Sequence, residues 1–141
     1  MGRRTLVARR RPDGRFDCRY AHWGVAADPV AQSRPVGRGW TAGAVLAELD
    51  CTYDRLCVFD GGTQRYPVCW LDPTLGDPDD IVLARTDDPE GLRTWWTTAK
   101  SHAVDAVADG AAPGAVRAML VAALARRAVV HDDASFLRSG R

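Results

Sequence analysis

The chain of 141 residues has no long apolar run, a single lysine and no asparagine. A bilayer-spanning helix needs about 20 consecutive apolar residues, so none is expected here. The opening stretch from Met1 to Leu6 lacks the apolar core of a secretory signal. Lys100 stands against 18 arginines, a bias typical of a GC-rich genome. We therefore expect a soluble cytoplasmic protein in which codon usage explains part of the arginine excess.

Signatures of common enzyme and metal sites are missing as well. No Gly-x-Ser-x-Gly elbow, Walker loop or dinucleotide-binding glycine pattern occurs. The 4 cysteines include no Cys-x2-4-Cys pair, the usual zinc-ligand spacing. Cys18 and His22, four residues apart on an expected strand, would lie ~13 Å apart, too far for one ion. We therefore expect no metal and no cofactor.

The net charge of +1 hides three segments of different sign. Residues 1–40 hold 9 Arg and 3 Asp, residues 41–90 hold 3 Arg and 11 acids, and residues 91–141 hold 7 bases and 4 acids. Clustered arginines are typical of surfaces that bind phosphates. Either the basic segment binds an anionic partner, or it pairs with the acidic segment of the same chain.

Length and composition predict a single domain over residues 1–141. A hydrophobic share of 46% and a charged share of 26% are ordinary for globular proteins. Strands are expected over 5–11 and 15–22, joined by a Pro12-Asp13-Gly14 turn. Phe16, Cys18, Tyr20 and His22 would share one face of the second strand. Residues 24–40 lack periodicity and are expected to form a long loop.

A short helix and a second hairpin are expected next. Thr41 can cap a helix over about 42–49. Strands over 55–59 and 65–71 follow, and Pro67 would place the second of them at a sheet edge or a bulge. A further short strand is expected over 81–84.

Two of the cysteines lie in this second hairpin. If its loop is Gly62-Thr63-Gln64, Cys57 and Cys69 become directly opposed and able to form a disulfide. Other loop lengths separate them. A reducing cytoplasm favours free buried thiols.

From residue 88 the apolar period becomes helical. Asp88, Pro89 and Glu90 are typical of a helix start. An apolar stripe that includes Trp95 and Trp96 follows, and we interpret both rings as core. A second helix is expected from Pro113 to about Ala128, and residues 130–141 are expected to fray. If the stripe is wider than one sheet face, the helices would form a homodimer interface.

These elements predict an α+β fold. Two hairpins and a short strand would form an antiparallel sheet, covered on one face by the two C-terminal helices.

The basic N-terminal hairpin is the main candidate for a binding surface. Its arginines are Arg9, Arg10, Arg11, Arg15 and Arg19. A two-stranded ribbon of this kind can lie along a nucleic-acid backbone. Phe16, Tyr20 and Trp23 would stack bases if their face were open; otherwise that face is the core beneath helices. We expect a non-catalytic binding domain with an anionic partner, either nucleic acid or an acidic protein.

An enzyme is the alternative hypothesis. His22, next to Tyr20 and Trp23 at a strand end, would be its base or ligand, and the 24–40 loop would form its pocket. The competing interpretation is a structural histidine that completes an apolar strand face. A lone histidine defines no reaction.

Three segments of the N-terminal third carry a family resemblance. They are Met1-Gly2-Arg3-Arg4-Thr5-Leu6-Val7-Ala8, Arg11-Pro12-Asp13-Gly14 and Tyr20-Ala21-His22-Trp23-Gly24. Together they resemble an uncharacterised family of small haloarchaeal proteins with a Met-Gly-x-Arg-x-Leu-Val-Ala start and a Tyr-x-His-Trp-Gly box. A looser likeness runs through Trp95-Trp96 and residues 115–127. The resemblance implies no assigned activity.

Overall fold

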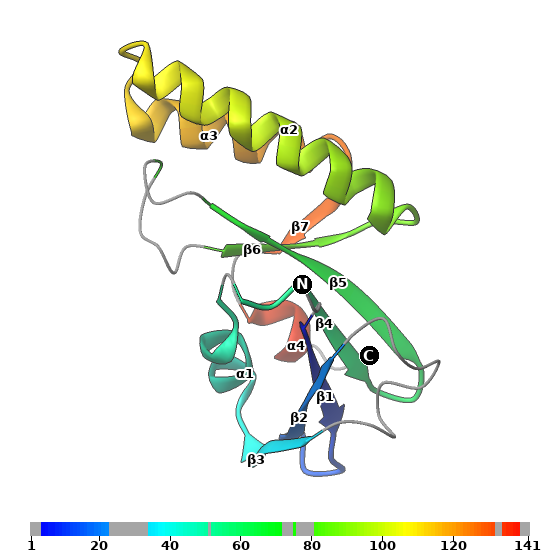
Figure 1. Cartoon of the computed structure of the whole chain (residues 1–141). Helices are drawn as coiled ribbons and strands as arrows, with labels where there is room; N and C mark the ends of the chain where they lie inside the picture. The colour runs from blue at the N-terminus through cyan, green and yellow to red at the C-terminus, as the bar shows by residue number, and fades with distance from the viewer. Residues whose placement is uncertain are drawn as a thin grey trace.

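The computed structural model describes residues 4–22, 34–50, 52–71, 75, 81–131 and 134–138 (Figure 1). The elements follow one another as β1 (Arg4–Arg10), β2 (Phe16–His22), β3 (Arg34–Trp40), α1 (Ala42–Glu48), β4 (Arg55–Phe59), β5 (Thr63–Trp70), β6 (Ile81–Arg85), α2 (Pro89–Ala108), α3 (Pro113–Ala125), β7 (Val129–His131) and α4 (Ser135–Arg138). The α+β class expected from the sequence is confirmed.

The strands of the described part form one mixed sheet in the order β3-β2-β1-β4-β5-β6-β7. Neighbours pair antiparallel except β1 and β4, which are parallel. The expected purely antiparallel sheet was therefore wrong in detail. Hairpin signals predict local pairs, but they do not say which strands of two hairpins will meet. Here the chain passes through α1 after β3, and β4 joins the sheet beside β1.

Both expected hairpins are present. In the first, Arg10 lies opposite Phe16, and Gly14 adopts a positive φ of 83° in the turn, as the Pro-Asp-Gly sequence predicts. In the second, Phe59 lies opposite Thr63, so the loop is residues 60–62 and Gly61 has the positive φ. The loop therefore lies earlier in the chain than the one needed for a disulfide.

Cys57 and Cys69 are accordingly not bridged. Cys57 lies opposite Arg65, whereas Cys69 lies opposite Val82 on the next strand. Both are buried free thiols.

The second strand of this hairpin is not an edge strand, contrary to the expectation from Pro67. β5 lies between β4 and β6, but its pairing with β6 begins only at Val68. The N–H of Val68 donates to the Asp54 carbonyl on the β4 side. Because successive N–H groups of a strand point to opposite edges, the Pro67 nitrogen faces the β6 side just beyond the last paired residue. The N–H group that Pro67 lacks is therefore not needed for any hydrogen bond between β5 and β6.

The expected 24–40 loop is partly a strand. Residues 34–40 form β3 at the edge of the sheet, while residues 24–33 lie outside the described part. Pro35, Gly37 and Gly39 hide the period-2 pattern of a strand, and the β2–β3 register shifts twice along this pair. The Gly39 N–H donates to the Asp17 carboxylate at 3.0 Å, which holds the edge strand to β2.

Gly37 provides the space for the partly buried ring of Trp40. A Cβ built on Gly37 would overlap the indole of Trp40, which packs against the core. Gly37→Ala should therefore lower the free energy of unfolding by about 1–3 kcal/mol through overpacking, measured by urea denaturation. Gly62→Ala is the matched control, because nothing lies within 4 Å of its Cβ position. Equal stability of the two variants would contradict this packing.

Helices cover both faces of the sheet rather than one. Figure 1 shows α2 and α3 above β5–β7, and α1 and α4 beside β1 and β4. Strands β5 and β6 are apolar on both sides: Val68 and Leu83 face one core, while Cys69, Val82 and Ala84 face the other. A strand buried on both faces has no alternation to indicate which side a helix covers.

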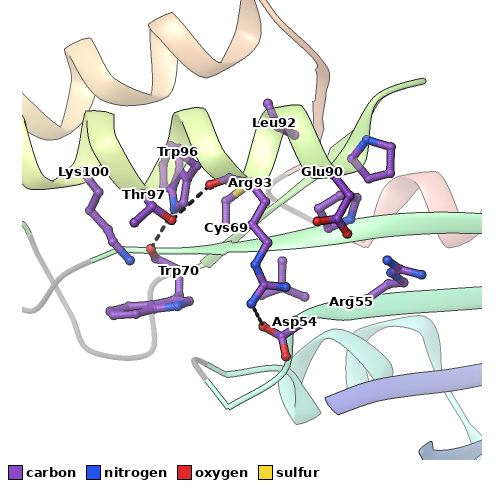
Figure 2. A pocket seen from close by; sticks show the side chains of 13 residues that line it. Asp54, Arg55, Cys69, Trp70, Glu90, Leu92, Arg93, Trp96, Thr97 and Lys100 are labelled. Carbon is purple, nitrogen blue, oxygen red and sulfur yellow. Dashed lines mark hydrogen bonds and ion pairs between the residues drawn. The ribbon is translucent and has the colours of Figure 1, made fainter. Parts of the chain in front are cut away.

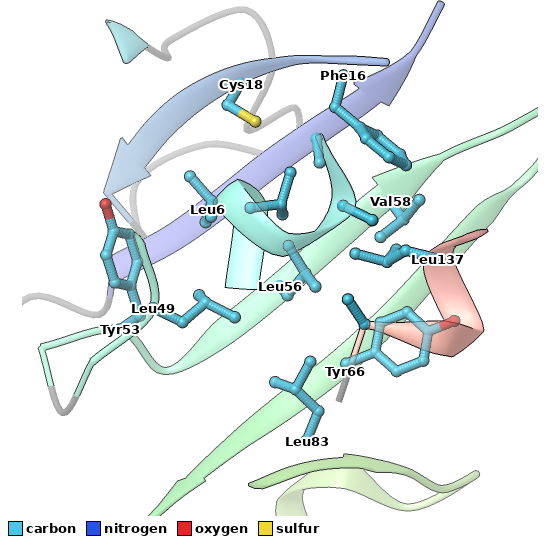
Figure 3. Close-up of a cluster of buried hydrophobic side chains, with 14 of the residues drawn as sticks. Leu6, Phe16, Cys18, Leu49, Tyr53, Leu56, Val58, Tyr66, Leu83 and Leu137 are labelled. Atoms are coloured by element: carbon cyan, nitrogen blue, oxygen red, sulfur yellow. The ribbon is translucent and has the colours of Figure 1, made fainter. Parts of the chain in front are cut away.

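The core on the α1 and α4 side is the larger one (Figure 3). Its buried members are Leu6, Ala8, Phe16, Cys18, Ala42, Val45, Leu49, Tyr53, Leu56, Val58, Tyr66, Val68, Leu83, Ala134 and Leu137. The even-numbered residues of β1 and β4, and Phe16, Cys18 and Tyr20 of β2, point to this side, so their odd-numbered neighbours point to the other.

The helical pair begins and ends close to the expected positions. The Asp88 carboxylate accepts a hydrogen bond from the Gly91 N–H at 3.0 Å, and Gly110 follows α2 with a φ of 107°. Trp96 is buried, as the apolar stripe predicts, and Trp95 packs beside it.

The C-terminal segment differs from the expected frayed tail. Residues 129–131 pair with β6, and α4 buries Leu137 in the core. Phe136 stacks on His131 at 4.4 Å between ring centroids and meets the edge of Tyr66 at 4.9 Å. These contacts anchor the segment to the sheet.

Candidate nucleic-acid interface

The five arginines predicted from the N-terminal hairpin have different environments. Strand alternation directs Arg9 and Arg19 to the sheet face opposite α1, whereas Arg10 points to the α1 and α4 side. The Arg10 guanidinium contacts Asp60 at 3.0 Å, stacks 4.8 Å above Phe16 and donates to the Leu137 carbonyl. Its side chain is 15% exposed. Arg10 is therefore part of the fold and pairs with the acidic middle segment.

Arg11 and Arg15 hold the turn end of the sheet together. Arg11 contacts Asp13 at 3.2 Å and Asp17 at 3.7 Å. Arg15 donates to the Gly39 carbonyl at 3.0 Å. All three contacts lie within the N-terminal segment, so none of them pairs these arginines with the acidic middle segment.

Arg9 and Arg19 line a shallow hollow on the sheet face that α1 does not cover. Its volume is about 320 Å³, and its lining residues are Val7, Arg9, Asp17, Cys18, Arg19, Pro35, Gly37 and Arg38. Arg9 and Arg38 are exposed. The hollow thus gathers three guanidinium groups and a single carboxylate from β1, β2 and β3.

A fourth arginine continues this surface across the sheet. The registers place Arg19, Val7, Cys57 and Arg65 in one row over β2, β1, β4 and β5. With strands ~4.8 Å apart, the backbones of Arg19 and Arg65 are separated by ~14 Å. We call Arg9, Arg19, Arg38 and Arg65 the basic sheet face.

Two arginines of this surface were not predicted. Arg38 lies in a segment that was expected to be a loop. Arg65 could have been placed on this face from the period-2 pattern of its hairpin, since it follows the loop in phase with Cys57 on the partner strand.

Two of the predicted aromatic residues, Phe16 and Tyr20, do not belong to the basic sheet face. Phe16 is fully buried in the core. Tyr20 lies on the same face of β2, and the Arg4 guanidinium stacks 4.5 Å from the centroid of the Tyr20 ring. Trp23 lies outside the described residues. The aromatic face of the hairpin is thus a core face, the alternative to base stacking that the sequence left open.

His22 ends β2 opposite Arg4, and its side chain lies outside the described part of the structure. The same holds for residues 24–33 of the pocket that the enzyme hypothesis requires. That hypothesis stays a prediction.

The described cysteines are inert as nucleophiles. Burial, and then the nearby Asp17 and Glu48 carboxylates, raise the pKa of Cys18 to about 12. Burial likewise raises the pKa of Cys69 to about 12, although Lys100 opposes it. The pKa of Cys57 is also raised by burial, despite Arg55 and Arg65 nearby. All three remain protonated at neutral pH, so none supplies a thiolate. Over the described ranges, no three His, Cys, Asp or Glu side chains group closely enough to hold a metal ion.

A second hollow, of about 250 Å³, lies between α2 and the strands β4 and β5 (Figure 2). Arg93 crosses it to Asp54 at 2.8 Å, and the Lys100 ammonium lies 3.2 Å from the Trp70 ring centroid. The Trp96 indole N–H donates to the Trp70 carbonyl at 3.3 Å. These groups satisfy one another and join the helix to the sheet, so we assign this hollow a structural role.

None of the helices in the described ranges is long and apolar enough to cross a membrane.

Comparison with known proteins gives one family match. Residues 1–43 match the model of a family of unknown function, DUF6735. These residues carry the motifs of the resemblance noted in the sequence and include β1, β2 and β3. No curated protein and no solved structure shows significant similarity to the chain. Over these 43 residues the chain is therefore similar to an uncharacterised family, and that similarity covers three of the four arginines of the basic sheet face.

Proposed function

We propose that this protein binds nucleic acid through the phosphate backbone, with the basic sheet face as the contact surface. One observation carries the proposal: four guanidinium groups from β3, β2, β1 and β5 share one face of the sheet, and Asp17 is the one acid among the described residues that line its hollow. Arginine guanidinium groups bind phosphate oxygens in a bidentate fork and remain charged at any physiological pH.

Two acids of the middle segment pair with arginines outside this face. Asp60 pairs with Arg10 on the opposite side of the sheet, and Asp54 pairs with Arg93 of α2. The near-zero net charge therefore arises from separated charges, and separated charges leave a local positive potential. Arg9, in particular, has no ion-pair partner among the described residues.

The shape of the face favours a polymer of phosphates over an acidic protein. Protein interfaces depend on buried aromatic or aliphatic anchors surrounded by a polar rim. Here the apolar residues between the arginines, Val7, Ala21 and Cys57, are already buried, and Phe59 is half-buried. Charges spread over ~14 Å instead suit successive phosphates, as in sequence-independent nucleic-acid binding.

Fluorescence anisotropy would test this function. Labelled 20-nucleotide single- and double-stranded DNA and RNA, and a polyglutamate of equal charge, would be titrated with the full chain at 0.1 M salt. We expect at least one nucleic acid to bind with a Kd of about 10⁻⁶–10⁻⁴ M, and polyglutamate to bind more weakly. Polyglutamate binding as tightly as the best nucleic acid would indicate an acidic protein partner. No binding to any nucleic acid would overturn the proposal.

A further inference from the structure

A second groove, which shares only Arg65 with the basic sheet face, lies where β4, β5 and β6 meet the start of α2 and the end of α3. Its volume is about 880 Å³. Its charged lining consists of five arginines and two aspartates: Arg55, Arg65, Arg85, Arg126, Arg127, Asp87 and Asp88. The arginines come from β4, β5, β6 and the two residues that follow α3. Tertiary folding, and not one local run of sequence, therefore produces this concentration of charge.

The pairing of the last strands explains how these arginines converge. Arg85 lies opposite Val129 on β7, and Arg126 and Arg127 precede Val129 by three and two residues. Arg85 also lowers the pKa of Tyr66 against the effect of burial, so it lies near the Tyr66 hydroxyl at the end of β6. Arg65 lines the groove from the opposite face of β5, because neighbouring residues of a strand alternate between the two faces. The groove is thus lined by Arg65 of β5, by Arg85 at the end of β6 and by the residues that follow α3.

The lining of the groove holds two aspartates against five arginines. The Asp88 carboxylate accepts the Gly91 N–H at the start of α2, and Asp87 is exposed. Arg65, Arg85, Arg126 and Arg127 are all exposed. The negative end of the α3 dipole favours Arg126 and Arg127, but it gives no reason for the arginines on the strands. Like charges gathered in one concave site repel each other unless an anion enters.

We propose that this groove binds a compact di- or triphosphate group, as carried by a nucleotide or by inorganic polyphosphate. A volume of about 880 Å³ lies within the usual range of ligand pockets, ~300–1,000 Å³, and admits a nucleoside triphosphate. Forked guanidinium donors from several directions match the oxygens of a polyphosphate better than those of a single carboxylate. This inference goes beyond the proposed function, because it concerns a discrete small ligand at residues outside the N-terminal hairpin.

One contact in the groove provides an optical reporter. The Arg127 guanidinium lies 4.5 Å from the Trp95 ring centroid. A phosphate that binds Arg127 would shift this cation over the indole and change Trp95 fluorescence. The Trp95→Phe variant should lose the fluorescence change while it keeps the binding.

Calorimetric titration of the full chain with tripolyphosphate, ATP and sulfate at constant ionic strength would test the site. We expect tripolyphosphate to bind more tightly than sulfate, and Arg85→Ala/Arg126→Ala to weaken it by about 10-fold to 100-fold. The Arg9→Ala/Arg38→Ala variant is the matched control and should retain the affinity. ATP binding more tightly than tripolyphosphate identifies a nucleotide ligand, and equal binding identifies the phosphate chain alone.

Two results would overturn this inference. One is that neither tripolyphosphate nor ATP produces a heat of binding, a shift in melting temperature or a change in Trp95 fluorescence. The other is an equal loss of affinity in the groove variant and in its control. All four substituted arginines are exposed, and circular dichroism would verify that both variants fold. Nucleic-acid binding that persists after either result would leave the proposed function intact, so the two failures are distinguishable.

Discussion

Replacing Arg9 and Arg38 together with alanine should weaken the binding of a duplex oligonucleotide by about 60-fold at 0.1 M salt. Each phosphate contact to a duplex releases about 0.9 counterion. Losing one contact therefore lowers the affinity by ~8-fold at this salt concentration. Both side chains are exposed and line the same hollow, so their loss should leave the fold unchanged. Anisotropy with the tightest-binding 20-nucleotide probe measures the effect.

A variant with the same change in net charge distinguishes direct arginine–phosphate contacts from a general effect of the protein's net charge. Thr94→Glu/Ser101→Glu on the exposed side of α2 lowers the net charge by two, as does the arginine pair. We expect this control to weaken binding by less than about 3-fold, because its charges are distant and screened over ~10 Å. Equal losses in both variants would show that the basic sheet face is not the contact surface.

The second large effect concerns stability. Leu137→Ala should lower the free energy of unfolding by about 2–5 kcal/mol, the cost of removing a buried leucine and leaving a cavity. Leu137 is 2% exposed and packs in the core beneath the sheet, where its carbonyl also accepts a hydrogen bond from Arg10. Chemical denaturation measures the change.

Met119→Ala is the matched control for this substitution. Met119 also lies on a helix near the C-terminus, but it is 72% exposed, so we expect a change within about 0.5 kcal/mol. A frayed C-terminal segment would make the two variants equally stable, and that result would contradict the packing of α4.

Local signals in the sequence were sufficient for several elements. Pro12-Asp13-Gly14 predicts the first hairpin because only such residues provide a preset φ followed by a positive one. Thr41 and Asp88 predict helix starts because their side chains accept the N–H groups that a first turn leaves unpaired, and both bonds are present.

Non-local features were not predictable in this way. The parallel pairing of β1 with β4 joins residues about 50 positions apart, and no local pattern indicates it. The edge strand β3 contains a proline and two glycines, and it is held by contacts with β2 rather than by its own propensity. Strand β7 and helix α4 are too short to be recognised from periodicity, and they form because the core accepts Leu137.

The basic sheet face was likewise predictable from local sequence only in part. Alternation along β1 correctly separates Arg9 from Arg10, yet only the fold reveals that Asp60 neutralises Arg10. Arg38 and Arg65 reach the surface through sheet pairing alone. The choice between an internal ion pair and a free cation depends on tertiary contacts, so charge counts along the chain leave it open.

The most direct test of nucleic-acid binding by the basic sheet face is the slope of log K against log salt concentration. Four phosphate contacts, from Arg9, Arg19, Arg38 and Arg65, predict a slope of about −3.6 for duplex DNA or −2.8 for a single strand. The Arg9→Ala/Arg38→Ala variant should halve that slope. A slope near zero, or one that is identical in the native chain and the variant, would contradict the account.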